Sequence, residues 1–194
     1  HYMDWPEYTN EVVNGDIHTA NMKAAGLKDR DQSKKFIYAF LYGAGASKLG
    51  KVVGGSAGMG QNLITKFLTN MPKLKELREN IIEASQKGTI IALDGRLLHI
   101  RADYASLNTL LQGAGAIICK QWLVHITERI RKSGVDAKLV ASIHDEYQFE
   151  VAKKDIKEFG QITKDAMKET EKTLNVRCPL DCEFKIGTTW SETH

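Results

Sequence analysis

Residues 30–43 read RDQSKKFIYAFLYG, a stretch that combines a strong helical pattern with two cations and two phenols. These four side chains stand four residues apart, and that spacing keeps them on one slowly spiralling stripe of an α-helix. They are Arg30, Lys34, Tyr38 and Tyr42. Because the apolar residues between them can face a core, we predict a helix over residues 30–42 that ends at Gly43.

A stripe of this composition suits a nucleotide. Arginine matches phosphate oxygens through its planar fork and lysine through its point charge. An aromatic ring further along the helix can stack on a base or a sugar. The alternative is an ordinary amphipathic helix whose cations are solvated and whose tyrosines are half buried.

The composition of the chain sets broad limits on its class. It has 194 residues, 42% of them hydrophobic and 26% charged, which is typical of a globular protein and excludes a disordered or fibrous one. The net charge of +3 permits nucleic-acid binding without indicating it. No apolar run reaches the ~18 residues of a membrane span, so we expect no membrane partner. The three cysteines lack the spacing of a zinc site, and we expect reduced thiols.

The pattern along the chain predicts helices first and then a mixed end with few strands, which is an α+β fold. A Gly-rich joint is expected at residues 54–60, and the small and apolar residues in the middle of 103–132 predict a buried helix. We expect helices over residues 7–26 in two pieces, with a break near Asn14-Gly15 and Asp16 as the cap of the second piece. Further helices are expected over residues 30–42, 47–53, 61–87 with a break at Pro72, 103–132 and 153–174. We expect strands over residues 89–93, 96–101, 138–143, 146–151 and 180–186.

Residues 138–151 read KLVASIHDEYQFEV and predict a hairpin with an acidic tip. His144 and Asp145 are residue types that tolerate a positive φ, and Glu146 follows them. Carboxylates on a rigid support suit Mg²⁺. Phosphoryl transfer commonly uses two such ions ~4 Å apart, which requires a second aspartate on a neighbouring strand. The alternative is an ordinary polar hairpin turn.

Taken together and in this order, these stretches resemble motifs of the family A DNA polymerases, in particular phage members. R-x3-K-x3-Y-x3-YG resembles motif B, and HDE between apolar strands resembles motif C. GDIHT at residues 15–19 and LDGR at 93–96 resemble further elements of the family. The resemblance covers essentially the whole chain. It implies a fingers subdomain over residues 1–102 and the C-terminal part of a palm subdomain over 103–194.

The resemblance implies a site for the incoming deoxynucleoside triphosphate on the fingers helix. Arg30 and Lys34 would hold the triphosphate, Lys34 with a catalytic role. Tyr38 would lie by the sugar, where the family discriminates deoxyribose from dideoxyribose. Tyr42 would stack near the templating base and help to exclude ribose. His18 would contact a phosphate oxygen, although a histidine at such a position is often only a surface or capping residue.

The same resemblance implies a metal site on the hairpin. Asp145 would be the second metal-binding aspartate, in an active site that holds two Mg²⁺ ions. Glu146 would be a catalytic residue near the metals or the primer end, and His144 would contact the primer backbone.

Primer and template contacts are implied for the long helix. SLNTLLQGAGAIICK at residues 106–120 resembles the palm helix of the family. Asn108 and Gln112 lie one turn apart, where their amides could reach the minor groove, with Gly43 close to the DNA. Their alternative role is internal hydrogen bonding. Tyr104 stands where many bacterial members carry a basic residue, so one DNA contact is in question.

Motif A, the strand with the first metal-binding aspartate, is expected just upstream of His1, and this sequence does not contain it. Asp4, Glu7 and Glu11 lie in a polar helical stretch and do not replace it. We therefore expect this chain alone not to extend a primer, and to need a segment or second chain that carries motif A and the thumb. The alternatives are an inactive excised fragment or a non-catalytic nucleotide- or DNA-binding module. Self-association is also expected, since half a palm exposes strand edges. The resemblance places the protein in the cytoplasm of a bacterial or phage-infected cell.

Overall fold

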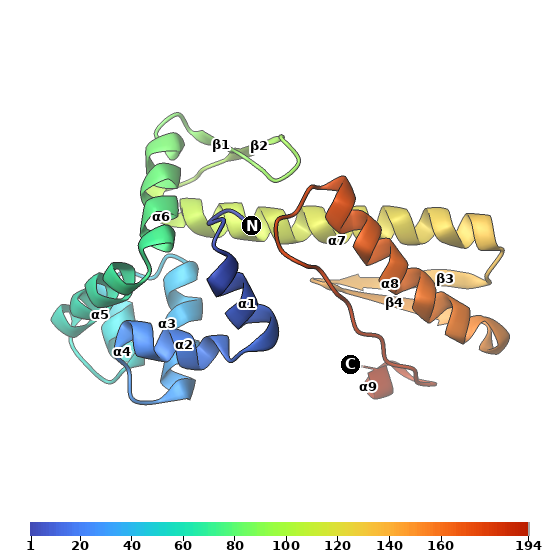
Figure 1. The fold of residues 1–194 in the computed structure, drawn as a ribbon, viewed down its shortest axis with the longest axis horizontal. Helices are drawn as coiled ribbons and strands as arrows, with labels where there is room; N and C mark the ends of the chain where they lie inside the picture. Colours follow the sequence, from blue (N-terminus) through green and yellow to red (C-terminus); the bar gives the residue numbers. More distant parts are fainter. Residues whose placement is uncertain (194) are drawn as a thin grey trace. The chain divides into compact units, whose positions relative to one another are not determined.

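The computed structural model describes residues 1–193 and is mostly helical, with two small antiparallel sheets (Figure 1). The predicted α+β class is confirmed. The chain divides into two compact units, His1–Gln112 and Gly113–His194, and each is described by itself. The helices and strands of the first unit are α1 (Pro6–Asn14), α2 (Ile17–Ala25), α3 (Arg30–Leu41), α4 (Ala46–Val52), α5 (Ala57–Asn70), α6 (Pro72–Ser85), β1 (Thr89–Ile91), β2 (Leu97–His99) and the 3-10 turn Asp103–Ala105. Helix α7 (Ser106–Ser133) begins in the first unit and continues into the second, which adds β3 (Ala137–Ile143), β4 (Glu146–Val151), the 3-10 turn Lys153–Asp155, α8 (Ile156–Thr173) and α9 (Trp190–Thr193).

The core of the first unit is built on the apolar face of α3. Phe36 and Phe40 are buried and meet Phe67 of α5 edge-on, each with ring centroids 5.5 Å apart. Edge-to-face contacts of this kind are the favoured arrangement of buried aromatic rings. The expected separation of α3 into an apolar face and a polar stripe is therefore confirmed.

Helix α2 starts where the sequence predicts a break at Asn14-Gly15. The carboxylate of Asp16 accepts hydrogen bonds from the backbone N–H groups of His18 at 3.1 Å and Thr19 at 3.3 Å, which is an N-cap. The hydroxyl of Ser33 on α3 donates to the carbonyl oxygen of His18 at 3.1 Å. This bond ties the first turn of α2 to α3.

The second unit has its own small core. Trp122 and Ile126 of α7 pack with Ala166 and Met167 of α8, and the indole N–H of Trp122 donates to the carbonyl oxygen of Thr163 at 2.9 Å. Helix α8 lies alongside the β3–β4 hairpin in the ribbon view (Figure 1). The hairpin is thus supported by packed helices.

The predicted strand at Leu180–Ile186 is wrong, because this segment has no regular structure. The backbone groups of its first residue, Leu180, are bonded by side chains of α8 instead of by a neighbouring strand. The Leu180 N–H donates to Glu171 Oε2 at 2.7 Å, and Lys168 Nζ donates to the Leu180 carbonyl oxygen. A segment without a strand to pair with does not form a sheet.

Two further expectations need correction. The Gly-rich joint is shorter than predicted, because α5 begins at Ala57 and includes Gly60. A Cβ atom at Gly60 would lie 1.9 Å from the carbonyl oxygen of Ala46, so the glycine permits close contact between α4 and α5. Helix α7 is not buried on every side, since Val124 is 47% exposed and Gly115 is exposed as well.

Among residues 1–193, none of the helices has the length and apolar character that crossing a membrane requires.

Candidate functional site

The polar face of α3 presents a row of accessible side chains. Lys34 is exposed, Tyr38 is 48% exposed and Tyr42 at the end of the helix is 57% exposed. The two phenols therefore add accessible aromatic rings to the cations on this face of α3. The stripe predicted from the four-residue spacing therefore exists as an accessible surface.

His18 lies beside this stripe. Its ring centroid is 6.4 Å from that of Tyr38, and its Nδ1 atom is buried without a hydrogen-bond partner in the part of the chain that the structure describes. A buried polar atom without a partner is costly, and a functional role is one physical reason for a protein to keep such an atom. The structure thus brings together the predicted residues of α2 and α3.

Arg30, the first residue of α3, forms an ion pair that the sequence did not predict. Its Nε donates to Asp16 Oδ2 at 2.9 Å and its Nη2 donates to Asp16 Oδ1 at 3.1 Å. The hydrogen bond from Arg30, with a second one from Thr19, holds the pKa of Asp16 well below its usual range. The same pair raises the pKa of Arg30. Sequence reasoning treated Asp16 only as a helix cap, because no periodic pattern links residues 16 and 30.

The C-terminal end of α3 meets the start of α7 within the first unit. The Gln112 side-chain amide donates to the Tyr42 hydroxyl at 3.3 Å. Gly43 adopts φ +79°, and a Cβ atom there would lie 2.5 Å from the carbonyl oxygen of Tyr104. Asn108 is half-buried one turn before Gln112. Four of the predicted primer, template and base contacts, together with Tyr104, therefore lie in one region.

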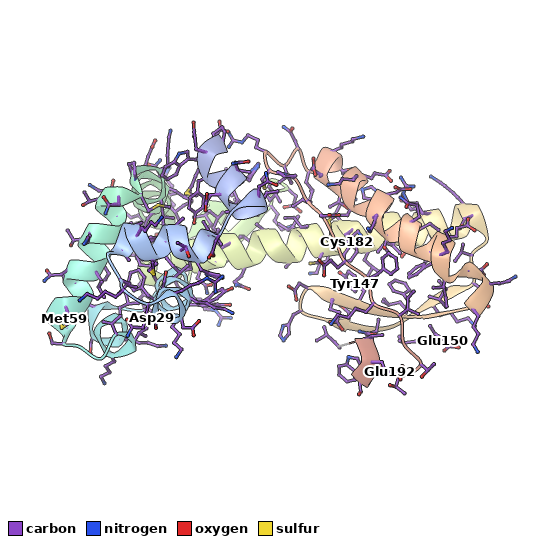
Figure 2. The ribbon with its side chains drawn as sticks, turned by 60° about the horizontal axis from the view of Figure 1, so that its bottom comes forward. Asp29, Met59, Tyr147, Glu150, Cys182 and Glu192 are labelled. Carbon is purple, nitrogen blue, oxygen red and sulfur yellow. The ribbon has the colours of Figure 1, made fainter. Side chains whose placement is uncertain are left out.

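The acidic hairpin of the second unit has the predicted two-residue turn. Ile143 pairs with Glu146, which leaves His144 and Asp145 at the tip. His144 has φ +50°, so the expected positive φ is confirmed at this residue. Behind the turn, the ring of Tyr147 packs against that of Trp122, with ring centroids 5.4 Å apart. Figure 2 shows Tyr147 on the side of the hairpin that faces the helices.

The carboxylates at the tip of the hairpin differ in their surroundings. The Asp145 side chain is exposed, and burial raises the pKa of the nearby Cys119 thiol, with the negative charge of Asp145 raising it further. The carboxylate of Glu146 accepts a hydrogen bond from the Gln148 amide. No group of three or more His, Cys, Asp or Glu residues that could hold a metal ion occurs within residues 1–193. This stretch can supply one or two carboxylate ligands, which is what Mg²⁺ usually takes from a protein.

Comparison with known proteins establishes the class. The chain belongs to DNA polymerase family A, whose family model matches residues 11–192. It is 42% identical over 219 residues to the DNA-directed DNA polymerase of Enterobacteria phage T3 and 40% identical over 219 residues to that of Escherichia phage T7. Each match covers 100% of this chain and 31% of the phage protein. The chain thus spans about a third of the length of these relatives, and the resemblance predicted from the motifs is confirmed.

More distant relatives agree with this assignment. DNA polymerase I of Geobacillus stearothermophilus is 26% identical over 185 residues, which cover 89% of this chain and 20% of that protein. Among solved structures, the POL domain of Pol1 from M. smegmatis, in complex with DNA primer-template and dNTP, matches with a TM-score of 0.78. That match covers 88% of this chain and 34% of the other at 19% identity, and it shows the likeness of fold alone.

Proposed function

We propose that this chain is the nucleotide-binding and second-metal portion of a template-directed DNA polymerase. Such an enzyme transfers deoxynucleotides from deoxynucleoside triphosphates to a primer 3′ end. One observation carries the proposal: the cationic and phenolic stripe of α3 is accessible along its length, and an unpartnered histidine nitrogen lies beside it. Membership of the family, and relatives that are DNA-directed DNA polymerases, support it.

The nucleotide would bind along α3. Lys34 is an exposed cation with no ion pair in the described part of the chain, so it can contact phosphate oxygens directly. Arg30, one turn earlier, offers the N–H groups that Asp16 does not use. Tyr38 would lie by the sugar, with His18 adding a contact to a phosphate oxygen. The order cation, cation, phenol along the helix therefore matches the order phosphate, phosphate, sugar in the ligand.

The templating base and the DNA would lie toward the C-terminal end of α3. The exposed ring of Tyr42 can stack on a base, and its hydrogen bond to Gln112 holds the ring in place. Asn108 and Gln112 would reach base edges in the minor groove, and Gly43 leaves room for a nucleotide to approach. The primer-template DNA and dNTP that accompany the Pol1 structure support these partners.

The hairpin would provide a metal ligand. Asp145 would hold Mg²⁺, with Glu146 near the metal or the primer end and His144 on the primer backbone. When bound, Mg²⁺ neutralises charge on the phosphates and on the attacking oxygen. In the reaction the primer 3′ hydroxyl gives up its proton to solvent and its oxygen forms a bond to the α-phosphorus. The bond from the α-phosphorus to the oxygen that bridges to the β-phosphorus breaks, and pyrophosphate leaves. Lys34 would stabilise the negative charge that develops on the departing pyrophosphate.

A second metal-binding carboxylate would come from a segment that carries motif A, outside the sequence described here. The origin of the relatives in phages and bacteria supports an origin in the cytoplasm of a bacterial or phage-infected cell.

Nucleotide affinity tests the stripe. The affinity of the chain for a deoxynucleoside triphosphate is measured by calorimetry for the unchanged chain, Lys34→Ala and Lys35→Ala. Lys35 is the matched control, because it is an exposed lysine on the same helix but outside the stripe. We expect Lys34→Ala to weaken binding by about 2–3 kcal/mol, the scale of a lost charge-assisted contact. Equal affinities of the two variants would contradict the assignment of Lys34.

Primer extension tests the hairpin. The chain is combined with a segment of a phage relative that carries motif A and the thumb, and synthesis is followed with Mg²⁺. We expect no extension by the chain alone, restored extension in the mixture, and loss of that activity in Asp145→Ala. Asp136→Ala, at the other end of β3, is the control and should stay active. Restored activity with Asp145→Ala would refute the metal assignment, and a mixture that binds nucleotide without synthesis would favour a non-catalytic binding module.

A further inference from the structure

The carboxylate of Asp16 links α2 and α3, the two helices that carry the candidate phosphate contacts. It caps α2, whose second residue is His18, and it pairs with Arg30 at the start of α3. The Thr19 hydroxyl also donates to Asp16 Oδ2, at 2.7 Å. Both carboxylate oxygens thus accept a bond from Arg30 and at least one from α2. One side chain thus caps α2 and pairs with the first residue of α3.

The pairing uses only one edge of the guanidinium group. Asp16 takes the Nε–H and one N–H of Nη2, the side-on edge. The two N–H groups of Nη1 and the second N–H of Nη2 have no partner in the part of the chain that the structure describes. These remaining donors form the end-on fork, whose geometry matches two oxygens of one phosphate group.

We propose that Asp16 is a positioning residue for the triphosphate: it holds Arg30 side-on so that the end-on fork of the guanidinium faces a phosphate group. The inference rests on the proposed function, which assigns Arg30 to the triphosphate but gives Asp16 no role. Arginine has many rotamers, and a side chain that is held before binding loses less freedom when the ligand arrives. The half-exposed position of the pair leaves the fork accessible, since the side chain of Arg30 is 51% exposed.

The opposite possibility is competition, in which the triphosphate must displace Asp16 from the guanidinium group of Arg30 before it can bind there. The geometry favours positioning, because three N–H groups stay available while both bonds to Asp16 persist. The same carboxylate also bonds the backbone N–H of His18, so displacing Arg30 would not release Asp16 from α2. The two possibilities predict opposite signs for the loss of the Asp16 charge.

The test exploits the similarity of aspartate and asparagine as helix caps. Asp16→Asn keeps an N-cap of equal preference and removes the charge that holds Arg30. Asp29→Asn is the matched control, since Asp29 caps α3 through the N–H groups of Asp31 and Gln32 and neighbours Arg30 in sequence (Figure 2). Inorganic tripolyphosphate is the probe, because it presents phosphate oxygens and neither base nor sugar.

We expect Asp16→Asn to weaken tripolyphosphate binding three- to tenfold, with Asp29→Asn within twofold of the unchanged chain. In an Arg30→Ala background, Asp16→Asn should have no further effect, a result that a purely structural role would not give. The Arg30 Nε–H signal, followed by NMR in the free chain, should lose its protection from exchange in Asp16→Asn only. Unchanged or tighter binding in Asp16→Asn, or an additive effect in the double variant, would overturn the inference.

The proposed function is judged separately in the same experiment. If the unchanged chain binds tripolyphosphate and Lys34→Ala weakens this binding, the stripe stands whatever Asp16→Asn does. If the unchanged chain binds no tripolyphosphate, the triphosphate site and the role of Asp16 are both refuted.

Discussion

The carbonyl oxygen of Tyr104 lies 2.5 Å from the place that a Cβ atom on Gly43 would occupy. Gly43, which follows the C-terminal end of α3, is therefore in close contact with the backbone that precedes α7, within the first unit. No side chain fits between them. In the same region, the Gln112 side-chain amide of α7 donates a hydrogen bond to the Tyr42 hydroxyl.

Gly43→Ala should therefore destabilise the chain strongly. The left-handed φ costs an alanine about 1–2 kcal/mol, and the steric overlap adds about 1–3 kcal/mol. Gly88→Ala separates the two effects, because Gly88 has a similar φ, +77° against +79°, and nothing within 4 Å of its added Cβ. Urea unfolding followed by circular dichroism should give the larger loss for Gly43→Ala. Equal losses would show that the Tyr104 contact is absent.

Tyr38→Phe should change the choice between deoxy- and dideoxynucleotides. The proposed position of the Tyr38 hydroxyl lets it take over a hydrogen bond that a missing 3′ hydroxyl leaves unmade, so its removal should favour the natural nucleotide. We expect the ratio of the two affinities to shift by about tenfold, which corresponds to about 1.4 kcal/mol. Tyr42→Phe serves as a comparison, and the same ratio in Tyr38→Phe and the unchanged chain would remove Tyr38 from the sugar site.

The Asp16–Arg30 pair should make the stability of the chain depend on pH at acid values. The bond from Arg30 lowers the pKa of Asp16 in the folded chain, so the ionised carboxyl stabilises the fold above about pH 4, where an unfolded aspartate is ionised. This contribution is lost as the pH falls further, through the lowered pKa. The difference in melting temperature between the unchanged chain and Asp16→Asn should thus be present at pH 7 and shrink between about pH 4 and pH 2. A difference that stays constant over this range would contradict the pairing.

The hairpin should depend on the tryptophan behind it. Trp122 is 8% exposed and Trp190 is 57% exposed. Trp122→Ala should reduce the free energy of unfolding of the second unit by about 3–5 kcal/mol, through lost packing and the lost bond to Thr163. Trp190→Ala, the control, should change it by less than about 1 kcal/mol. Similar losses in the two variants would mean that Trp122 does not anchor the hairpin.

The sequence predicted the parts of the fold that local rules determine. The four-residue spacing in α3, the Asp16 cap and the two-residue turn at His144 depend on neighbouring residues, and the structure confirms each of them. The strand predicted at Leu180–Ile186 is wrong because a strand needs a partner strand. Side chains of α8 bond the first residue of this stretch instead. Local composition does not reveal such tertiary contacts.

The candidate site was predictable in its residues but not in its contacts. The motifs indicated Arg30 and Tyr42, whereas the pairing of Arg30 with Asp16 and the approach of Tyr104 to Gly43 join positions that no periodic pattern relates. The prediction that α7 is buried was also wrong, because a sequence does not distinguish small residues that are exposed from small residues that are buried. Gly115 is an example, with open space around it.

The stripe of α3 is proposed to bind the triphosphate of a nucleotide. This binding is tested most directly by titrating the ¹⁵N-labelled chain with a deoxynucleoside triphosphate. The backbone amide signals are recorded by NMR at each step of the titration. We expect saturable shifts at His18, Arg30, Lys34 and Tyr38, and little change at Lys35 or Lys87. No shifts, or shifts confined to residues outside α2 and α3, would contradict it.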